Sequence, residues 1–295
     1  MGKSNHFCRF FCNFARKIEN MLIYPNAKIN IGLHVVERRK DGYHNLETVF
    51  YPIPLTDALE IHANDNGNDC DLRVGGTVLA GGPEDNLVMK AFRLLQSEFP
   101  DKVKGVRTSL VKQIPTGAGL GGGSSDGAFM LKALNERFSL GLSAEELQKH
   151  AAKLGADCPF FIENQPVLAT GIGDVFTKIS LSLKGKTLIL VKPAIGVSTR
   201  DAYSQVVPAK PEVPLQQLIQ LPLSDWKDAI HNDFERSVFA IYPEIAGIKD
   251  RLYDLGAFYV SMSGSGSAVF GLFDAPIEHI DEIFSGYFIR QRTLD

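Results

Sequence analysis

A glycine-rich segment at residues 115–128, PTGAGLGGGSSDGA, carries the strongest chemical signal in this sequence. Its six glycines let the backbone turn several N–H groups toward one point, because glycine adopts conformations that other residues avoid. The helix expected at 124–138 adds its positive N-terminal end, beginning with Ser124 and Ser125. Backbone N–H groups and a helix N-terminus bind anions, so we expect this loop to hold a chain of phosphate groups.

Other phosphate-binding loops fit this segment less well. Gly117, Gly119 and Gly122 match the G-x-G-x-x-G spacing of dinucleotide-binding folds, but the next segment is a capped helix instead of a second parallel strand. Asp126 stands where a P-loop requires lysine, and the VAIK, HRD and DFG signatures of protein kinases are absent. The remaining alternative is a glycine turn that only caps a helix.

The first half of the chain reads as strands and helices placed around this loop. Apolar residues occupy the odd positions of 27–35, which predicts a strand with one buried face and with Lys28 and Asn30 together on the other face, off the core. The remaining elements expected here are a turn at 41–42, strands at 46–53 and 57–63, a helix at 85–99, a strand at 106–114, and helices at 124–138 and 143–155, the last with a capping box from Ser143 to Glu146.

The second half of the chain continues this mixture without regular alternation. The elements expected are a hairpin around 171–174, a strand at 186–193, a proline-rich connection at 208–222, helices within 224–255, two strands around 261–267, and a final helix and strand. This order predicts an α+β fold in two domains.

Composition narrows the class of protein. The 295 residues are 44% hydrophobic, and a net charge of -3 provides no general field for nucleic acid or anionic lipid. No run approaches the ~20 apolar residues that span a bilayer. We therefore expect a soluble cytoplasmic protein that binds neither nucleic acid nor membrane.

The spacing of the cysteines and the composition of the N-terminal segment also favour a cytoplasmic protein. The four cysteines, Cys8, Cys12, Cys70 and Cys158, lack the spacing of a metal site, and we interpret them as reduced thiols. Residues 1–20 are basic and aromatic but fit a signal peptide poorly, so we expect a disordered extension before a domain that begins near Met21.

Three motifs in this order resemble those of the galactokinase, homoserine, mevalonate and phosphomevalonate (GHMP) kinase superfamily: PNAKINIGLHV at 25–35, the glycine loop, and MSGSGSAVFGLF at 262–273. The resemblance implies the two-domain α+β fold of that superfamily, with a nucleotide-binding domain at 21–180, similar to domain 2 of ribosomal protein S5, and a ferredoxin-like domain at 181–295. It also implies ATP as the phosphoryl donor and Mg²⁺ as its companion ion. No metal ligands are assigned.

Two further segments, DGYHN at 41–45 and GADCPFF at 155–161, resemble one branch of the superfamily. Its members phosphorylate the 2-hydroxyl of a small cytidine-diphosphate substrate in the non-mevalonate isoprenoid pathway. The resemblance implies that Asp157 is the catalytic base and Lys28 its partner. It places ATP against Asn86, Pro115, Thr116, Gly117, Ala118, Gly119, Leu120, Gly121, Gly122, Gly123, Ser124 and Ser125. It places the substrate against Asn30, Tyr43, His44, Thr199, Tyr203, Ser263, Gly264, Ser265 and Gly266. A monomer or weak homodimer is expected.

Two other functions stay open on the sequence alone. One is a sister kinase that acts on homoserine, a mevalonate or a sugar, and DGYHN with Tyr203 argues against it because those substrates offer no base to stack. The other is a nucleotide-binding regulator without catalysis, which the presence of both Asp157 and Lys28 disfavours. Taken singly, Asp157 fits a turn residue and Lys28 a solvated lysine.

The segment HNDFER at 231–236 also resembles the superfamily. No chemistry follows from it, and Asn232 or Asp233 is interpreted as a helix N-cap.

Overall fold

The computed structural model describes residues 20–64, 67–77 and 82–295. The expected extension lies outside these residues apart from Asn20, and so do Cys8 and Cys12. Cys70 and Cys158 are free, buried thiols, as expected for reduced cysteines.

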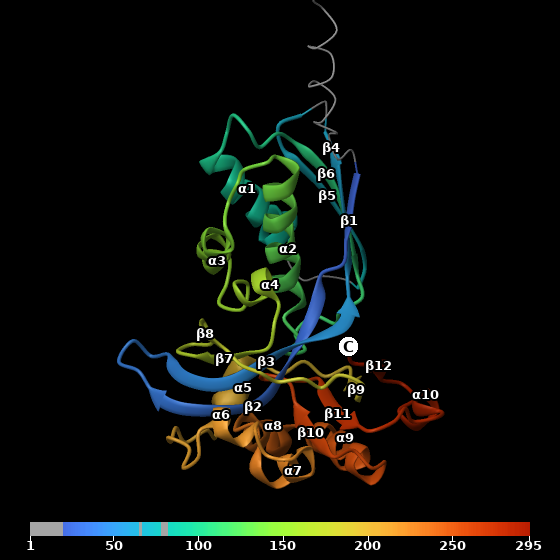
Figure 1. Cartoon of the computed structure of the whole chain (residues 1–295). Coiled ribbons are helices and arrows are strands. Elements are labelled where there is room, and N and C mark those ends of the chain that lie inside the picture. The colour runs from blue at the N-terminus through green and yellow to red at the C-terminus, as the bar shows by residue number, and fades with distance from the viewer. Residues whose placement is uncertain (1–19, 65–66, 78–81) are drawn as a thin grey trace, which may run out of the picture.

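The upper part of the molecule in Figure 1 is a four-stranded sheet covered by helices on one face. Its strands lie in the order β1 (Asn20–Ile23), β4 (Ala58–Ala63), β6 (Val106–Lys112) and β5 (Cys70–Gly76), and only β5 and β6 are parallel. The helices are α1 (Leu87–Glu98), α2 (Gly122–Arg137) and α3 (Ala144–Ala152). A core that includes Phe92, Leu95, Leu110 and Leu131 seals the helices against the sheet.

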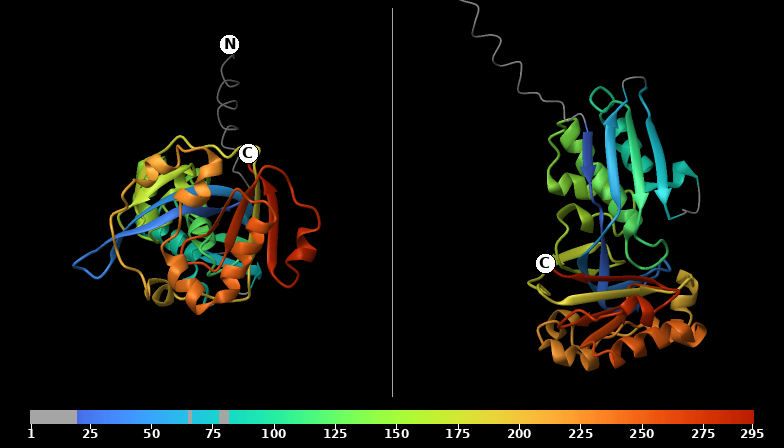
Figure 2. Two further views of the ribbon diagram at one scale, coloured as in Figure 1. Left: turned by 90° about the horizontal axis from the view of Figure 1, so that it is seen from below. Right: turned by 90° about the vertical axis from the view of Figure 1, so that its right-hand side faces the viewer.

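Two more sheets form the middle and the lower parts of the molecule (Figure 1 and Figure 2). The middle sheet is antiparallel, in the order β2 (Asn26–Arg38), β3 (His44–Thr56), β7 (Val167–Thr170) and β8 (Val175–Lys178). The lower sheet has the order β10 (Tyr259–Met262), β11 (Val269–Phe273), β9 (Thr187–Lys192) and β12 (Phe288–Thr293).

Strand β9 shows how the lower sheet buries both of its faces. Leu188 and Leu190 pack into a core shared with Ile29 and Ile31 of β2. Ile189 and Val191 point the other way, into a core formed with α8 (Phe234–Ile241) and α9 (Pro243–Asp254). A strand covered on both faces reads as a continuous apolar run, which is what the segment TLILV provides.

Short helices and turns complete the chain. They are η1 (Pro83–Asp85), α4 (Phe160–Glu163), α5 (Thr199–Tyr203), α6 (Leu215–Leu218), η2 (Leu223–Asp225), α7 (Trp226–Ala229) and α10 (Ile280–Ile283).

Local signals placed most elements correctly, with differences at their ends. The capping box of α3 is confirmed, since the Glu146 N–H donates to Ser143 Oγ and the Ser143 N–H donates to the Glu146 carboxylate. The expected hairpin at 171–174 joins β7 to β8. Helix α2 begins at Gly122 and not at Ser124, because Gly121 takes the left-handed conformation that ends the loop.

The expectation that Lys28 and Asn30 point off the core is wrong in one respect. Both side chains do share one face of β2, but they are only 4% and 3% exposed. The alternation of apolar and polar residues predicted that one face of this strand meets solvent. In the folded chain the glycine loop and Phe50 cover that face.

Candidate active site

The glycine loop connects β6 to α2 and lies against β2 and the loop between β10 and β11. The N–H of Lys28 donates to the carbonyl of Leu120 at 3.0 Å, and the N–H of Ala268 donates to the carbonyl of Ala118 at 3.3 Å. Gly117, Gly119 and Gly121 have positive φ angles of 59°, 74° and 69°. The loop therefore needs glycine for its turns, and it lies between the two halves of the chain.

Close packing gives a second reason for glycine in this loop. A Cβ on Gly119 would lie 1.9 Å from the carbonyl oxygen of Ser263. A Cβ on Gly123 would meet nothing within 4 Å, and Gly123 is exposed in the first turn of α2. The loop is therefore open at Gly123, in the first turn of α2, and also at Gly117, where a Cβ would meet nothing within 4 Å either.

Lys28 and Asp157 form an ion pair beside this loop. The Lys28 ammonium lies 3.5 Å from the Asp157 carboxylate, donates to Asn30 Oδ1 at 2.6 Å and lies 4.5 Å from the centre of the Phe50 ring. Burial lowers the pKa of Lys28, and the Asp157 carboxylate partly opposes that shift. The Asp157 side chain is 32% exposed, in the turn between α3 and α4, so the pair joins a buried cation to a carboxylate that a substrate can reach.

Asn30 connects this pair to the loop between β10 and β11. Asn30 Nδ2 donates to Thr48 Oγ1 at 3.0 Å, and its backbone N–H donates to Ser263 Oγ at 3.2 Å. Ser263 Oγ in turn donates to the carbonyl of Gly119 at 2.9 Å. The structure thus brings together five of the predicted site residues, Lys28, Asn30, Gly119, Asp157 and Ser263.

A buried charge cluster below the loop was not anticipated from the sequence. The Lys112 ammonium contacts the carboxylates of Asp57 and Asp126, the latter at 2.6 Å, and each of the three residues is at most 3% exposed. Asp57 Oδ1 also accepts the N–H groups of Gln113 and Ile114, which immediately precede the loop. Burial and the neighbouring Asp57 raise the pKa of Asp126 to about 7. No local pattern marks Lys112 or Asp57, because their partners are distant in sequence.

The residues expected to recognise the base lie on the β2–β3 hairpin and on α5. The rings of His44 and Tyr203 are stacked, with centroids 4.6 Å apart and an interplanar angle of 28°. Burial and the charge of Arg38 lower the pKa of His44. Tyr43 is 62% exposed at the tip of the hairpin, which projects from the body of the molecule in Figure 2.

The other predicted site residues take several positions. The side-chain oxygen of Asn86 caps α1 by accepting the Val88 N–H at 2.9 Å. Thr199 is exposed in the first turn of α5. A Cβ on Gly264 would lie 3.2 Å from Asn30 Oδ1, and Ser265 is half-buried in the same loop.

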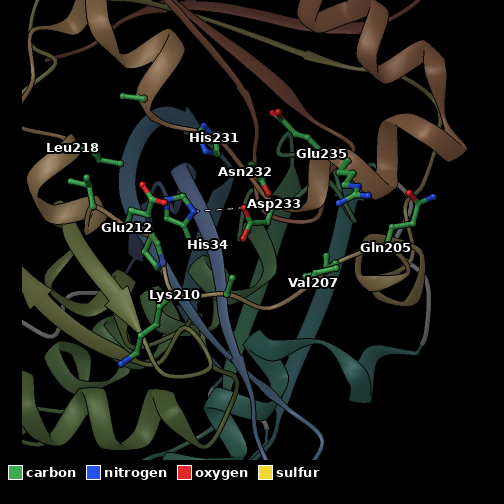
Figure 3. Close-up of a pocket in the computed structure, with 16 residues that line it drawn as sticks. His34, Gln205, Val207, Lys210, Glu212, Leu218, His231, Asn232, Asp233 and Glu235 are labelled. Atoms are coloured by element: carbon green, nitrogen blue, oxygen red, sulfur yellow. Dashed lines mark ion pairs between the residues drawn. The ribbon is translucent and has the colours of Figure 1, made fainter.

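A separate cavity of about 670 Å³ borders the HNDFER segment (Figure 3). It is lined by His34, residues 205–207 and 209–213, and most of the segment itself, and neither Lys28 nor Asp157 borders it. His34 Nδ1 lies 3.7 Å from an Asp233 oxygen, and its Nε2 is buried with no hydrogen-bond partner among the described residues.

The part of the chain that the structure describes contains no group of three or more His, Cys, Asp or Glu side chains that could hold a metal ion. None of its helices has both the length and the apolar character needed to cross a bilayer.

Comparison with known families agrees with this geometry. Residues 86–165 match the GHMP kinases N terminal domain, and residues 215–287 match the GHMP kinases C terminal domain. Fold and site together define the class: an ATP-dependent small-molecule kinase with the GHMP fold. The α+β architecture expected from the sequence is thereby confirmed.

Individual relatives narrow the class further. The 4-diphosphocytidyl-2-C-methyl-D-erythritol kinase of Bacteroides fragilis is 55% identical over 276 residues, which cover 93% of this chain and all of that protein. A crystal structure of 4-(cytidine 5'-diphospho)-2C-methyl-D-erythritol kinase is 32% identical, with a TM-score of 0.76 over 92% of this chain and 98% of that one. The chain belongs to the 4-diphosphocytidyl-2-C-methyl-D-erythritol kinase family.

A sister kinase shares only the fold. A homoserine kinase from Cytophaga hutchinsonii superposes with a TM-score of 0.67 over 95% of this chain and 96% of that one, at 17% identity. The comparisons therefore favour the cytidyl branch over the homoserine and mevalonate branches.

Proposed function

We propose that this protein transfers the γ-phosphoryl group of ATP to the 2-hydroxyl of 4-diphosphocytidyl-2-C-methyl-D-erythritol. The products are the 2-phosphate and ADP, in the non-mevalonate pathway to isoprenoid precursors. One observation carries the chemistry: the buried Lys28 ammonium lies 3.5 Å from the reachable Asp157 carboxylate, on a strand that bonds directly to the glycine loop.

Asp157 acts as the base in this proposal. A carboxylate that is 32% exposed can accept a hydrogen bond from an incoming hydroxyl and take its proton as the new O–P bond forms. Phosphoryl transfer depends mainly on position and charge, so the main task of this group is to orient the hydroxyl.

Lys28 stabilises the charge that develops on the transferring group. Burial strengthens its field, and Asn30 and Asp157 hold the ammonium in a fixed place. The glycine loop and the first turn of α2 offer backbone N–H groups to the phosphates. Asn86, at the start of α1, is proposed to contact the adenine.

Mg²⁺ fits this site as an ion carried mainly by the nucleotide. Mg²⁺ prefers oxygen ligands and is commonly held by one or two carboxylates together with substrate phosphates. The hydroxyl of Ser124, in the first turn of α2, is an oxygen group next to the loop that would join its coordination. When bound, the ion neutralises phosphate charge.

We place the cytosine at the hairpin tip, between the two halves of the chain. The ring of His44 covers one face of Tyr203, and Phe234 packs against the same ring in a T-shaped arrangement. A base entering this place would take the position of His44 against the Tyr203 ring, with His44 moved to its edge and Tyr43 closing from the exposed side. Thr199, in the first turn of α5, and Ser265 and Gly266, in the loop after β10, are proposed to hold the remainder of the substrate.

This recognition predicts a specific loss for Tyr203→Ala. Stacking of a base on an aromatic ring contributes ~1 to 3 kcal/mol in nucleic-acid binders, so the KM for the cytidyl substrate should rise about ten- to a hundred-fold. Tyr203→Phe is the matched control and should be nearly silent, because the ring face makes the contact. An unchanged KM in Tyr203→Ala would place the base elsewhere.

The function itself is tested by ADP release. The protein should form ADP with ATP and the cytidyl alcohol, and phosphorus NMR should show a new monophosphate ester at the 2-position. Homoserine and mevalonate are the controls and should give at least a hundred-fold lower kcat/KM. Equal rates with either control would replace the cytidyl function by that of a sister kinase.

We further propose that the chain divides into domains at 21–180 and 181–295 and works in the cytoplasm as a monomer or weak homodimer. It would act on its small-molecule substrate without nucleic acid or membrane. The free thiols of Cys70 and Cys158 support a reducing location such as the cytoplasm. Measurement of the molar mass in solution by light scattering would test the oligomeric state.

A further inference from the structure

The HNDFER segment forms the start of α8 and contacts both motifs that carry the site. Its backbone pairs with β2: the Leu33 N–H donates to the His231 carbonyl at 3.0 Å, and the Asp233 N–H donates to the Leu33 carbonyl at 2.9 Å. Asp233 Oδ2 also accepts the Val35 N–H at 2.7 Å. The segment therefore lies alongside the strand that carries Lys28, joined to it by a parallel bridge between Leu33 and Asn232.

The side chain of Asn232 forms two hydrogen bonds to the end of β10 and the loop that follows it. Its Nδ2 group donates to the carbonyls of Met262 and Gly264, both at 2.8 Å, and its Oδ1 accepts the Phe234 N–H at 3.0 Å. The side chain is 3% exposed, so every bond is shielded from water. Ser263, the residue between the two bound carbonyls, is held from both sides.

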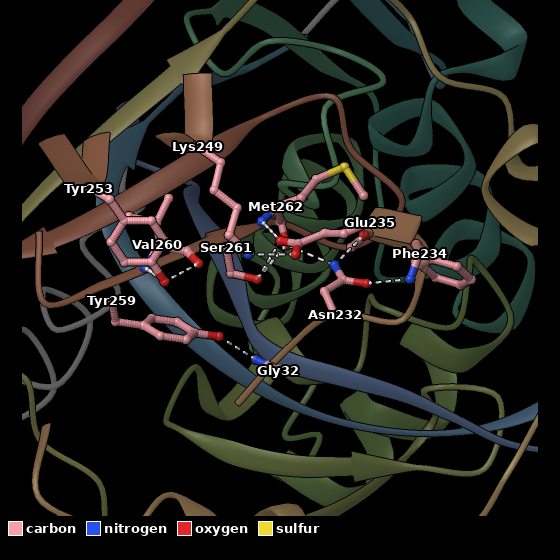
Figure 4. A network of polar contacts seen from close by, with 11 residues as sticks. Gly32, Asn232, Phe234, Glu235, Lys249, Tyr253, Tyr259, Val260, Ser261 and Met262 are labelled. Atoms are coloured by element: carbon pink, nitrogen blue, oxygen red, sulfur yellow. Dashed lines mark hydrogen bonds and ion pairs between the residues drawn. The ribbon is translucent and has the colours of Figure 1, made fainter. Parts of the chain in front are cut away.

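Glu235 supports the same place from the next turn of the helix (Figure 4). One carboxylate oxygen accepts the Met262 N–H at 2.8 Å, and the other receives the Lys249 ammonium at 2.6 Å. Asn232 and Glu235 therefore satisfy both backbone groups of Met262. A buried charge that is fully paired gives a rigid support.

Ser263 transmits this support to the reacting groups. Its hydroxyl accepts the Asn30 N–H and donates to the Gly119 carbonyl, and Asn30 Oδ1 accepts the Lys28 ammonium. A connected path thus runs from Asn232 by hydrogen bonds to Met262 and Gly264, along their backbone to Ser263, and by further hydrogen bonds through Asn30 to Lys28.

We propose that Asn232 is a positioning residue for phosphoryl transfer, with Glu235 as its support: it fixes Ser263 so that Asn30 and the glycine loop hold Lys28 in register with Asp157. This inference deepens the proposed function and rests on it. A misplacement of about 1 Å can cost a hundred-fold in rate, so a clamp remote from the substrate can matter to turnover.

The kinetic test compares Asn232→Ala with Arg236→Ala, an exposed residue of the same segment. In Asn232→Ala, kcat should fall about ten- to a hundred-fold, while the Kd for a non-hydrolysable ATP analogue changes much less. Arg236→Ala should stay within about twofold of the wild type. Asn232→Ser keeps an uncharged acceptor for the Phe234 N–H but loses the amide donors, and it should show the same loss if the alanine variant does not fold.

A double variant tests the route through Ser263. If Asn232 acts through Ser263, Asn232→Ala combined with Ser263→Ala should be little slower than the slower single variant. Losses that multiply, or a folded Asn232 variant with kcat within about twofold of the wild type, would overturn the proposal.

Hydrogen exchange provides a readout that needs no substrate. The amide of Asn30 should exchange at least about tenfold faster in Asn232→Ala, while the amides of β4 keep their wild-type rates. An unchanged Asn30 amide would overturn the clamp. If the wild type lacks activity toward the cytidyl substrate yet this amide responds, the proposed function fails and the clamp stands.

Discussion

Two buried lysines lie on opposite sides of the glycine loop, and they differ in access to solvent. Lys28 pairs at 3.5 Å with Asp157, whose side chain is 32% exposed. Lys112 pairs with Asp57 and Asp126, which are 0% and 2% exposed. Adjacent glycines of the loop contact the two lysines. A Cβ on Gly121 would lie 3.3 Å from Lys28 Cε, and a Cβ on Gly122 would lie 3.4 Å from Lys112 Nζ.

The difference shows how one combination of charges can serve two purposes. A sealed pair has no route for a substrate and has exchanged its hydration for fixed partners, so removing one partner destabilises the fold. An open pair keeps one carboxylate hydrated and able to meet a hydroxyl. We therefore interpret the Lys112 cluster as the support of the loop and the Lys28 pair as the reacting site.

The largest effect is expected from the open carboxylate. Asp157→Asn should lower kcat by about two to four orders of magnitude, the usual range for loss of a general base, with little change in the affinity for an ATP analogue. Its melting temperature should fall only modestly, because Lys28 loses a partly hydrated counter-ion but keeps its hydrogen bond to Asn30. A variant that keeps more than about a tenth of the wild-type kcat would make Asp157 a turn residue.

Alanine substitutions at two adjacent glycines should distinguish the reacting pair from the supporting cluster, with effects of intermediate size on kcat and stability. In Gly121→Ala the added methyl group presses toward Phe161 and Lys28, so kcat should fall about tenfold. Stability should fall as well, because Gly121 has a φ of +69°, which alanine adopts only with strain. Gly122→Ala presses on Ile114 and Lys112, and it should lower stability by about 1 to 3 kcal/mol while kcat stays within about threefold. Thermal melts and steady-state kinetics on the two variants provide the comparison, and identical kcat losses would remove the distinction.

The smallest effect on the reaction is expected from the sealed cluster, whose titration should change stability and not the rate. The pKa of Asp126 is raised from 3.8 to about 7 in the folded protein, so its contribution to stability is complete below about pH 4 and is lost as the pH rises through 7. Asp126→Asn cannot titrate, so its stability relative to the wild type should increase between pH 4 and 7, by up to about 1.4 kcal/mol per pH unit. Urea unfolding across this range measures the difference, and parallel pH curves for the two proteins would contradict it.

Sequence reasoning succeeded where the signal was local. The capping box at Ser143, the glycine loop and the hairpin at 171–174 each depend on residues that are neighbours in the chain, and each was found in place. Spacing alone could not reveal that β2 is covered on both faces, because the covering residues come from the loop at 115–123 and from β3. The error concerning Lys28 and Asn30 has this origin.

The residues that support the site could not be predicted from the sequence for the same reason. Asp57 and Lys112 are 55 positions apart, and each alone resembles an ordinary surface charge. Asn232 fitted a helix cap, and its oxygen does accept the Phe234 N–H, but its two donors bind residues 30 and 32 positions away. Such partners are defined only by the tertiary fold.

The same substitution at both lysines tests the central claim most directly. Methionine keeps the length of the side chain and removes its charge. The measurement is the free energy of unfolding together with the rate of ADP formation for Lys28→Met and Lys112→Met. We predict that Lys28→Met loses at least about a hundred-fold in rate and changes stability by no more than about 1 kcal/mol, whereas Lys112→Met loses about 3 to 5 kcal/mol of stability and keeps its rate, per folded molecule, within about tenfold. The reverse pattern, or equal losses of both kinds in the two variants, would contradict the division between an open reacting pair and a sealed supporting one.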